Sequence, residues 1–500
     1  MAILTPVTEL GYKGLHANGR APVPVGYVSR AENMYLQGTA YVTRPALKSS
    51  ATDTVKANSR VQNIVQVTEL GGEQHTLAMV GGSLYEYDWR DEAWEAVTNS
   101  LPNVGIVVAP GARMDSHTYR GRVIFTDSVN APWYFKPDET ASDEKYKALN
   151  SANGDPAPLS RGVTVYYDRA FFFGLHAEDA NVFEWSRPGD LTDGYDADNN
   201  SWQFAQTDTG RVVSLVSLNE KMLVFKDDSI SVVYGAVEDA FRTDANREGI
   251  SETEGVESHR AVVVAPNGDV YYMSLNGPRV LQNGFNRIEL ALDGEGRDML
   301  SREWAKLDHS KQSEMVSWLD KTLNQIVWLW PLKGESSIRA GLVYSLDNNT
   351  WSTIRFPSGT DIVSAGNVED AGGREMVMLG DDGGRIYLLD PDGEADYGSN
   401  SLMSTLRSRA YGGHMVSRRV KLLRGEWLIR VLNEDTAITT IPIADHEMHG
   451  PSRSRTHGEG TMRLLRRFLR RGDTVGWEIQ ASKPIEVISS ETRVAAVEGQ

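Results

Sequence analysis

Residues 82–85 read GSLY, residues 268–271 GDVY, residues 341–344 GLVY and residues 384–387 GRIY. Each stretch is a glycine, a variable residue, an aliphatic residue and a tyrosine. Glycine tolerates the backbone of a tight turn, and aliphatic and aromatic residues favour a strand, so the pattern indicates a turn followed by a strand. Looser relatives of the pattern end at Phe125, Tyr166 and Phe225.

The spacing of the seven aromatic residues indicates a repeat. They lie at positions 85, 125, 166, 225, 271, 344 and 387, so the successive steps are 40, 41, 59, 46, 73 and 43 residues. A four-stranded propeller blade takes about 40–50 residues, and four of the six steps fall near that range. One copy would indicate only a hairpin, but seven copies favour a β-propeller of six or seven blades over a sandwich.

Two segments account for the long steps. One is rich in Asp and Asn, and we expect an insertion near residues 186–206. The other has Met299, Leu300, Trp304 and Leu307 at nearly helical spacing, so we expect a helical insertion near residues 290–312. The predicted fold is mainly β with few helices. It has an N-terminal arm and platform segment over residues 1–60, the propeller over 61–395, and a C-terminal β-rich platform or assembly domain over 396–500.

Composition narrows the possible functions. The chain has no cysteine, which excludes disulfides, thiolate metal sites and a cysteine nucleophile. The N-terminus lacks the pattern of a signal peptide, and no apolar run approaches the ~18 residues of a membrane span. The net charge of −17 disfavours non-specific binding to nucleic acid. Residues 401–475 hold 14 basic and 7 acidic residues, a net charge of +7, which leaves −24 for the rest. Such segregation suggests two surfaces with different partners, or simply a basic domain beside an acidic one.

A search for catalytic motifs finds no nucleophile elbow, zinc-protease helix or P-loop. His446, His449 and His457 lack the spacing of a helical zinc pair, and the cluster of Asp190, Asp193, Asp196 and Asp198 lacks the glycine and closing glutamate of a calcium-binding EF-hand loop. We therefore expect no catalytic residue, no cofactor and no metal. A propeller hydrolase or lyase acting on a polysaccharide remains the alternative, with Arg187, Arg211 and Arg279 available for a substrate carboxylate.

The arginine-rich segment 462–471 (MRLLRRFLRR) has two interpretations. As a helix it would place leucines and Phe468 on one face and arginines on the other. As a strand it would be a basic sheet edge. In both cases an assembly interface or a nucleic-acid contact fits better than a membrane, because the segment is short.

The order of several short motifs resembles one family. Arg30-x-x-Asn33-Met34-Tyr35, followed by Arg44-Pro45-Ala46-Leu47, resembles the "R-x-x-N-x-Y … x-P-G-L" opening of the tail nozzle, or packaged-DNA stabilisation, proteins of short-tailed bacteriophages. Ala46 replaces the usual glycine. The stretches 229–235 (SISVVYG), 268–274 (GDVYYMS), 326–331 (IVWLWP), 342–351 (LVYSLDNNTW) and 463–494 are similar to later parts of that family.

The resemblance implies a structural virion protein rather than an enzyme. It implies a homo-hexameric tube that extends the DNA channel below the portal and adaptor, retains packaged DNA and supports ejection. The expected partners are the adaptor protein, tail fibres, tailspikes or a tail needle, and the phage genome passing through the channel, with no small-molecule substrate. The expected location is the virion, after assembly in the bacterial host cytoplasm. The residues expected at the assembly interface are Arg30, Asn33, Tyr35, Arg463, Arg466, Arg467, Arg470 and Arg471.

Overall fold

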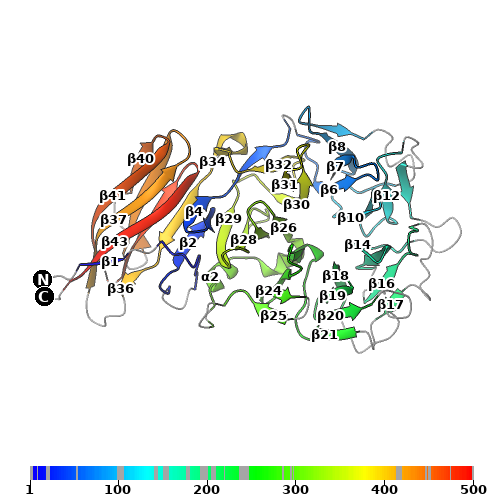
Figure 1. Ribbon diagram of the computed structural model, residues 1–500, viewed down its shortest axis with the longest axis horizontal. Coiled ribbons are helices and arrows are strands. Elements are labelled where there is room, and N and C mark those ends of the chain that lie inside the picture. Colours follow the sequence, from blue (N-terminus) through cyan, green and yellow to red (C-terminus); the bar gives the residue numbers. More distant parts are fainter. Residues whose placement is uncertain are drawn as a thin grey trace.

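The computed structural model has a ring of small β-sheets at one end and a β-sandwich at the other (Figure 1). It describes the whole chain apart from residues 1–3, 8–9, 19–22, 52–53, 98–105, 140–144, 150–156, 176–180, 192–200, 204–209, 219, 236–246, 284–285, 293–295, 297, 413–418, 445–446, 449–451, 473 and 498–500.

The ring is a propeller whose blades are four-stranded antiparallel sheets, and the described residues form seven of them. Blade one consists of β6 (Val61–Thr68), β7 (Gln74–Val80), β8 (Ser83–Asp88) and β9 (Ala93–Ala96). Blade two consists of β10 (Asp115–Tyr119), β11 (Arg122–Thr126), β12 (Trp133–Phe135) and β13 (Tyr146–Ala148). Blade three consists of β14 (Gly162–Tyr166), β15 (Arg169–Phe173), β16 (Val182–Trp185) and β17 (Ser201–Gln203). Blade four consists of β18 (Val212–Leu218), β19 (Lys221–Lys226), β20 (Ile230–Tyr234) and β21 (Arg247–Ser251). Blade five consists of β22 (Val262–Val264), β23 (Val270–Ser274), β24 (Gly277–Gln282) and β25 (Asn286–Glu289). Blade six consists of β26 (Val316–Asp320), β27 (Gln325–Leu329), β28 (Ala340–Ser345) and β29 (Thr350–Arg355). The first strand of each blade lies nearest the centre of the ring (Figure 1).

The seventh blade joins the two ends of the propeller. It consists of β30 (Ile362–Glu369), β31 (Glu375–Asp381), β32 (Ile386–Asp390) and β5 (Ala46–Ser49), with β5 as the outer strand. Its register pairs Tyr387 with Ser49 and Asp390 with Ala46. The segment 1–60 is therefore not wholly outside the propeller, because its strand β5 closes the ring.

Each blade contains one aromatic residue of the sequence repeat, but not at the same strand. Tyr85, Tyr344 and Tyr387 lie on third strands, while Phe125, Phe225 and Tyr271 lie on second strands. The last of the seven, Tyr166, lies on the first strand of blade three. The irregular steps thus reflect a change of strand as well as insertions.

The predicted helix near residues 290–312 is mostly absent. The helices in its described residues are α2 (Ser301–Trp304) and the start of a 3-10 helix, η4 (His309–Glu314). No side chain caps the start of α2, and the Asp308 side chain accepts a hydrogen bond from the Ser310 backbone and begins a new turn. Met299 and Arg302 also bond to the backbone of Ala17, so contacts with the N-terminal segment override the helical period. The other short 3-10 helices are η3 (His259–Ala261) and η5 (Tyr397–Ser399).

The β-sandwich is assembled from both ends of the chain. One sheet contains β1 (Leu4–Val7), β3 (Met34–Gln37), β4 (Ala40–Thr43), β37 (Arg419–Val431), β41 (Gly460–Gly472) and β43 (Ile485–Val497). The facing strands are β2 (Val28–Glu32), β35 (Ser404–Ser408), β36 (Tyr411–Gly412), β38 (Thr436–Ala444), β39 (Glu447–Met448), β40 (Arg453–His457) and β42 (Thr474–Ala481). A small two-stranded sheet of β33 (Ala395–Asp396) and β34 (Asn400–Ser401) precedes β35 in the chain. Trp427 and Trp477 meet between the two layers, with ring centroids 5.4 Å apart.

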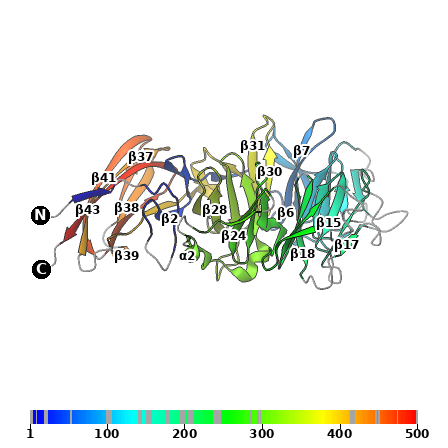
Figure 2. The same ribbon diagram turned by 60° about the horizontal axis from the view of Figure 1, so that its bottom comes forward.

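Strand β2 joins the sandwich to the propeller. It pairs with β35 on one side and, in parallel, with β29 of blade six on the other, so one sheet runs through both domains. Figure 2 shows β2 between the two bodies, and both chain ends lie at the far end of the sandwich.

Candidate functional site

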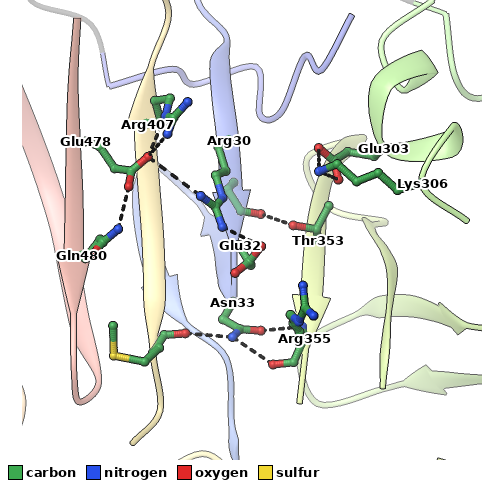
Figure 3. Close-up of polar contacts among 12 residues, drawn as sticks. Arg30, Glu32, Asn33, Glu303, Lys306, Thr353, Arg355, Arg407, Glu478 and Gln480 are labelled. Carbon is green, nitrogen blue, oxygen red and sulfur yellow. Dashed lines mark hydrogen bonds and ion pairs between the residues drawn. The ribbon is translucent and has the colours of Figure 1, made fainter. Parts of the chain in front are cut away.

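The stretch from Arg30 to Leu47 lies where the two domains meet, and Figure 3 shows its first residues, Arg30, Glu32 and Asn33. It covers the end of β2, strands β3 and β4, and the start of β5. We call the contacts of Asn33, Arg44 and Asp396 the joint, because they connect the N-terminal strands, blade six and the segment that leads into the sandwich.

Asn33 is the centre of the joint. Its side-chain nitrogen donates to the carbonyls of Arg355 and Met403, at 3.0 and 2.8 Å, and its side-chain oxygen accepts from the backbone N–H of Arg355 at 2.8 Å and from Arg44 Nε at 3.1 Å. The side chain is 4% exposed, so all of its hydrogen-bonding capacity is used in the interior. The backbone φ of +57° lies in the left-handed region, which asparagine tolerates better than most residues.

Arg44 and Asp396 form a buried ion pair beside Asn33. The two side chains are 1% and 2% exposed, and Arg44 Nη2 lies 2.5 Å from Asp396 Oδ2. A second bond, from Arg44 Nη1 to Asp396 Oδ1 at 3.0 Å, makes the pair bidentate. The same carboxylate oxygen accepts the backbone N–H of Leu47 at 3.0 Å, and the guanidinium lies over the Phe356 ring. The pair fixes the start of the ring-closing strand β5 to the segment that enters the sandwich.

A second polar cluster lies on the sandwich side of β2. The fully buried carboxylate of Glu478 accepts from Arg407 Nε at 2.6 Å and from Gln480 Nε2 at 2.7 Å, and Arg30 Nη1 lies 4.0 Å away. Arg30 also pairs with Glu32 on its own strand at 3.0 Å. These contacts hold β2, β35 and β42 side by side (Figure 3).

The joint changes the interpretation of three predicted assembly residues. Asn33 and Tyr35 are buried within this chain, and Tyr35 packs with the apolar core of blades six and seven. Their side chains are therefore not available for the contact with a second subunit that the sequence suggested. Arg30 has a side chain that is 38% exposed, and it is engaged with Glu32.

The arginine-rich segment is a strand, β41, rather than a helix. It pairs only with β37 among the described strands and so forms one edge of its sheet. The alternation of the strand buries Leu464, Arg466 and Phe468 and exposes Arg463 and Arg467.

The individual arginines of β41 have different surroundings. Arg463 pairs with Glu426 of the neighbouring strand β37. The backbone of Arg470 and Arg471 pairs with β37, but their side chains lie outside the described part of the chain.

Strand β40 places further positive charge beside this edge. Arg453 and Arg455 are exposed, and burial together with these two arginines lowers the pKa of Arg466 below its usual value. Arg466 is 7% exposed, and its Nε and Nη2 atoms have no hydrogen-bond partner within the described residues. We call Arg453, Arg455, Arg463, Arg466 and Arg467 the basic edge.

The candidate metal and substrate residues do not converge in the described structure. Asp190 is exposed at the start of its loop, whereas Asp193, Asp196, Asp198, His446 and His449 lie outside the described residues; His457 is on β40. Arg211 pairs with Asp227 and Glu257 in blade four, and Arg279 pairs with Glu254 in blade five. Arg187 follows β16 of blade three.

A further cluster, of acidic residues around His75, was not predicted from the sequence. Glu69, Glu73 and His75 bring three possible ligand atoms within 4.8 Å of one another. His75 lies between two carboxylates, with Nδ1 2.5 Å from Glu86 and Nε2 2.8 Å from Glu69. The hydrogen bond to Glu86 raises the pKa of His75, so the geometry suits a protonated imidazole held by two acids.

Comparison with known proteins finds only distant structural similarity. No protein family and no curated protein matches the sequence. Among solved structures, Raptor from Chaetomium thermophilum is 12% identical with a TM-score of 0.42, covering 69% of this chain and 29% of its own. The Pan2 WD40 domain from Neurospora crassa is 8% identical with a TM-score of 0.39, covering 71% and 96%. An extracellular two-component-system domain from B. thetaiotaomicron is 9% identical with a TM-score of 0.35; the match covers 83% of this chain but only 42% of that one.

With these low scores, the propeller assignment rests on the strand pairing itself. Within the described residues, no helix is both long and apolar enough to cross a bilayer.

Proposed function

We propose that the chain is a structural virion protein, the nozzle subunit in the tail of a short-tailed bacteriophage. Six copies form a tube that extends the DNA channel below the portal and adaptor, retains packaged DNA and supports its ejection. The partners are the adaptor, tail fibres or tailspikes, and the passing genome. In this proposal the chain has no catalytic function and is located in the virion after assembly in the host cytoplasm.

The observation that carries the proposal is the place of the motif residues in the fold. The stretch that resembles the nozzle family supplies Asn33, Arg44 and the ring-closing strand β5, which together hold two domains in one orientation. A motif that is needed to fix a propeller to a β-rich platform agrees with a family whose subunits have those two parts.

The basic edge supports the assembly step. Strand β41 has 13 residues and one side without a partner strand in the described structure, and an edge of this kind is a template for pairing with another chain. Residues 401–475 have a net charge of +7, and the rest of the chain has a net charge of −24, so two copies can attract each other through these unlike regions. A head-to-tail contact between a basic edge and the acidic body of the next copy is heterologous, and such contacts close into rings when the rotation allows.

Sedimentation velocity on the full chain tests this function. We expect a hexamer for the natural sequence and for Arg374→Glu, which reverses an exposed charge on the β30–β31 turn of the propeller. Reversing two exposed charges of the basic edge, Arg455→Glu with Arg467→Glu, should give monomers that unfold at an unchanged temperature. A wild-type chain that stays monomeric at high concentration, or a double variant that assembles like the wild type, would contradict the proposed assembly.

A further inference from the structure

One mouth of the propeller is a cavity lined by the segments that enter the innermost strands. Its volume is about 920 Å³, and its lining includes Arg60, Arg113, Arg161, Arg211, Glu257 and Glu314. Each of these residues precedes the innermost strand of a different blade, from blade one to blade six.

The arginines occupy equivalent positions in successive blades. Arg60, Arg161 and Arg211 each stand one residue before the innermost strand of blades one, three and four, and Arg113 stands two residues before that of blade two. The corresponding positions in blades six and seven hold carboxylates, Glu314 and Asp361. The mouth is therefore cationic over four consecutive blades and acidic over two.

The corresponding arginine of blade five, Arg260, lines the neighbouring central cavity rather than the mouth. It donates to the carbonyls of Val363, Gln62 and Met114, at 2.7, 3.2 and 2.6 Å. These carbonyls belong to the inner strands of blades seven and one and to the entrance of blade two. The Arg260 guanidinium is thereby held between three blades and is not one of the arginines that the mouth presents to a ligand.

Two of the arginines remain without a carboxylate partner. Arg211 is paired with Asp227 and Glu257, and Arg60 lies 3.7 Å from Asp382. Arg113 donates to the carbonyl of Ser313 at 2.5 Å, and neither Arg113 nor Arg161 forms an ion pair among the described residues. A guanidinium presents five N–H donors in a planar fork that matches a carboxylate, so these two side chains keep donors for a ligand.

The surroundings of these arginines favour a protein ligand. Val129 lines the cavity and is 66% exposed. The side chain of the following residue, Asn130, donates a hydrogen bond to the carbonyl of Val107 at 3.1 Å, and Val107 is itself 68% exposed. An apolar rim beside cationic groups suits a segment with alternating apolar and acidic side chains. Glu257 and Glu314 in the same lining limit how many negative charges the mouth can hold, so a segment with apolar residues between its carboxylates fits better than a nucleic acid with a phosphate at every residue.

We propose that this mouth binds an acidic segment of a partner protein, whose carboxylate is held by Arg113 and Arg161 while its apolar neighbours cover Val129. The inference goes beyond the nozzle function and does not depend on it, because all of the residues involved belong to one chain.

Fluorescence anisotropy with a labelled peptide of alternating Leu and Glu tests the proposal on the full chain. We expect saturable binding that weakens with salt, and no binding by the same peptide with Gln in place of Glu. In Arg113→Gln with Arg161→Gln, the loss of two charge-assisted contacts should weaken binding by at least about tenfold. The control Arg374→Gln should bind like the wild type.

Several results would overturn the proposal. These are no binding of the Glu peptide at millimolar concentration, equal binding of the Glu and Gln peptides, or unchanged affinity in a double variant with a wild-type melting temperature. Stronger binding of a single-stranded oligonucleotide or of a hyaluronan tetrasaccharide, used as competitors, would assign the mouth to a nucleic acid or to an acidic glycan instead. The comparison of the two peptides uses only the wild-type chain, so it decides the question even if the double variant does not fold.

Discussion

The propeller and the β-sandwich are built from the chain in opposite ways. Six of the seven blades are each formed by four consecutive strands, so most of their pairings join neighbours in the sequence. The sandwich instead places β1 beside β43 and β4 beside β43, which brings the first residues of the chain next to the last. Only the seventh blade, through β5, shares this long-range construction.

The difference shows which contacts unite the molecule. A single blade can form its hairpins locally, but the ring closes and the sandwich assembles only when residues 28–49 are in place. That segment supplies β2 to the shared sheet and β5 to the propeller, with the joint between them. We therefore expect damage to the joint to destabilise both regions together, whereas damage within one blade remains local.

The largest effect is expected for Asp396→Ala. The change leaves the guanidinium of Arg44 buried without its counter-charge, and breaking a buried pair in this way costs about 3–5 kcal/mol. Urea unfolding followed by intrinsic fluorescence measures the loss. The matched control is Glu394→Ala, which removes an exposed pair with Lys483 and should change the unfolding free energy far less. Equal losses in the two variants would show that the joint does not hold the domains together.

The second effect lies in the propeller mouth. Burial lowers the pKa of His259 to about 4, although Asp115, 3.6 Å away, acts in the opposite direction. Below pH 6.5 the unfolded chain binds a proton that the folded chain does not, so stability should fall by about 2–3 kcal/mol between pH 6.5 and pH 4. The difference in unfolding free energy between wild type and His259→Gln, measured across this range, isolates the contribution. A difference that does not change with pH would contradict this pKa.

Asn33 separates backbone from side-chain effects at the joint. Asn33→Ala loses four hydrogen bonds and strains a left-handed residue, whereas Asn33→Gly keeps the conformation and loses only the bonds. We expect both variants to lose at least about 2 kcal/mol, with the glycine variant more stable by about 0.5–1 kcal/mol. Thermal unfolding by calorimetry gives both values. An alanine variant as stable as the wild type would exclude a structural role for this side chain.

The smallest effect is a local one in blade one. The pKa of His75 is raised by Glu86, so its ion pairs stabilise the fold below pH 6.5 and this contribution disappears as pH rises through the raised pKa. His75→Gln should cost about 1 kcal/mol at pH 5.5 and almost nothing at pH 9. Chemical unfolding at the two pH values measures this difference. A cost at pH 9 that equals the cost at pH 5.5 would mean that the ion pairs contribute nothing.

The contrast between the regions also explains what the sequence could predict. One strand with an aromatic residue in each blade was enough to predict the propeller, because each blade repeats the same local structure, a turn followed by a buried strand. The strand position of that aromatic varies between blades, so the repeat gave the number of blades only as six or seven. The repeat could not predict that β5 is the outer strand of blade seven, because β5 pairs with β32 only when the ring closes.

The candidate sites were less accessible to sequence reasoning. Asp396 is 352 residues from Arg44, and no local pattern marks it as the counter-charge. Asn33 was found through its motif as a candidate assembly residue, and the motif did not show that its side chain bonds within the chain, since a polar residue can serve the interior as well as a partner. The arginines of the mouth did leave a signal, a basic residue one or two positions before the first strand of four successive blades. That signal becomes visible only when the strands are known.

Electron cryomicroscopy of the purified full-length chain tests the central claim most directly. The account predicts a closed ring of six subunits in which the basic edge, on β40 and β41, contacts the acidic body of the neighbouring subunit. Single two-domain particles with this edge exposed to solvent, at concentrations where the ring should be complete, would contradict it.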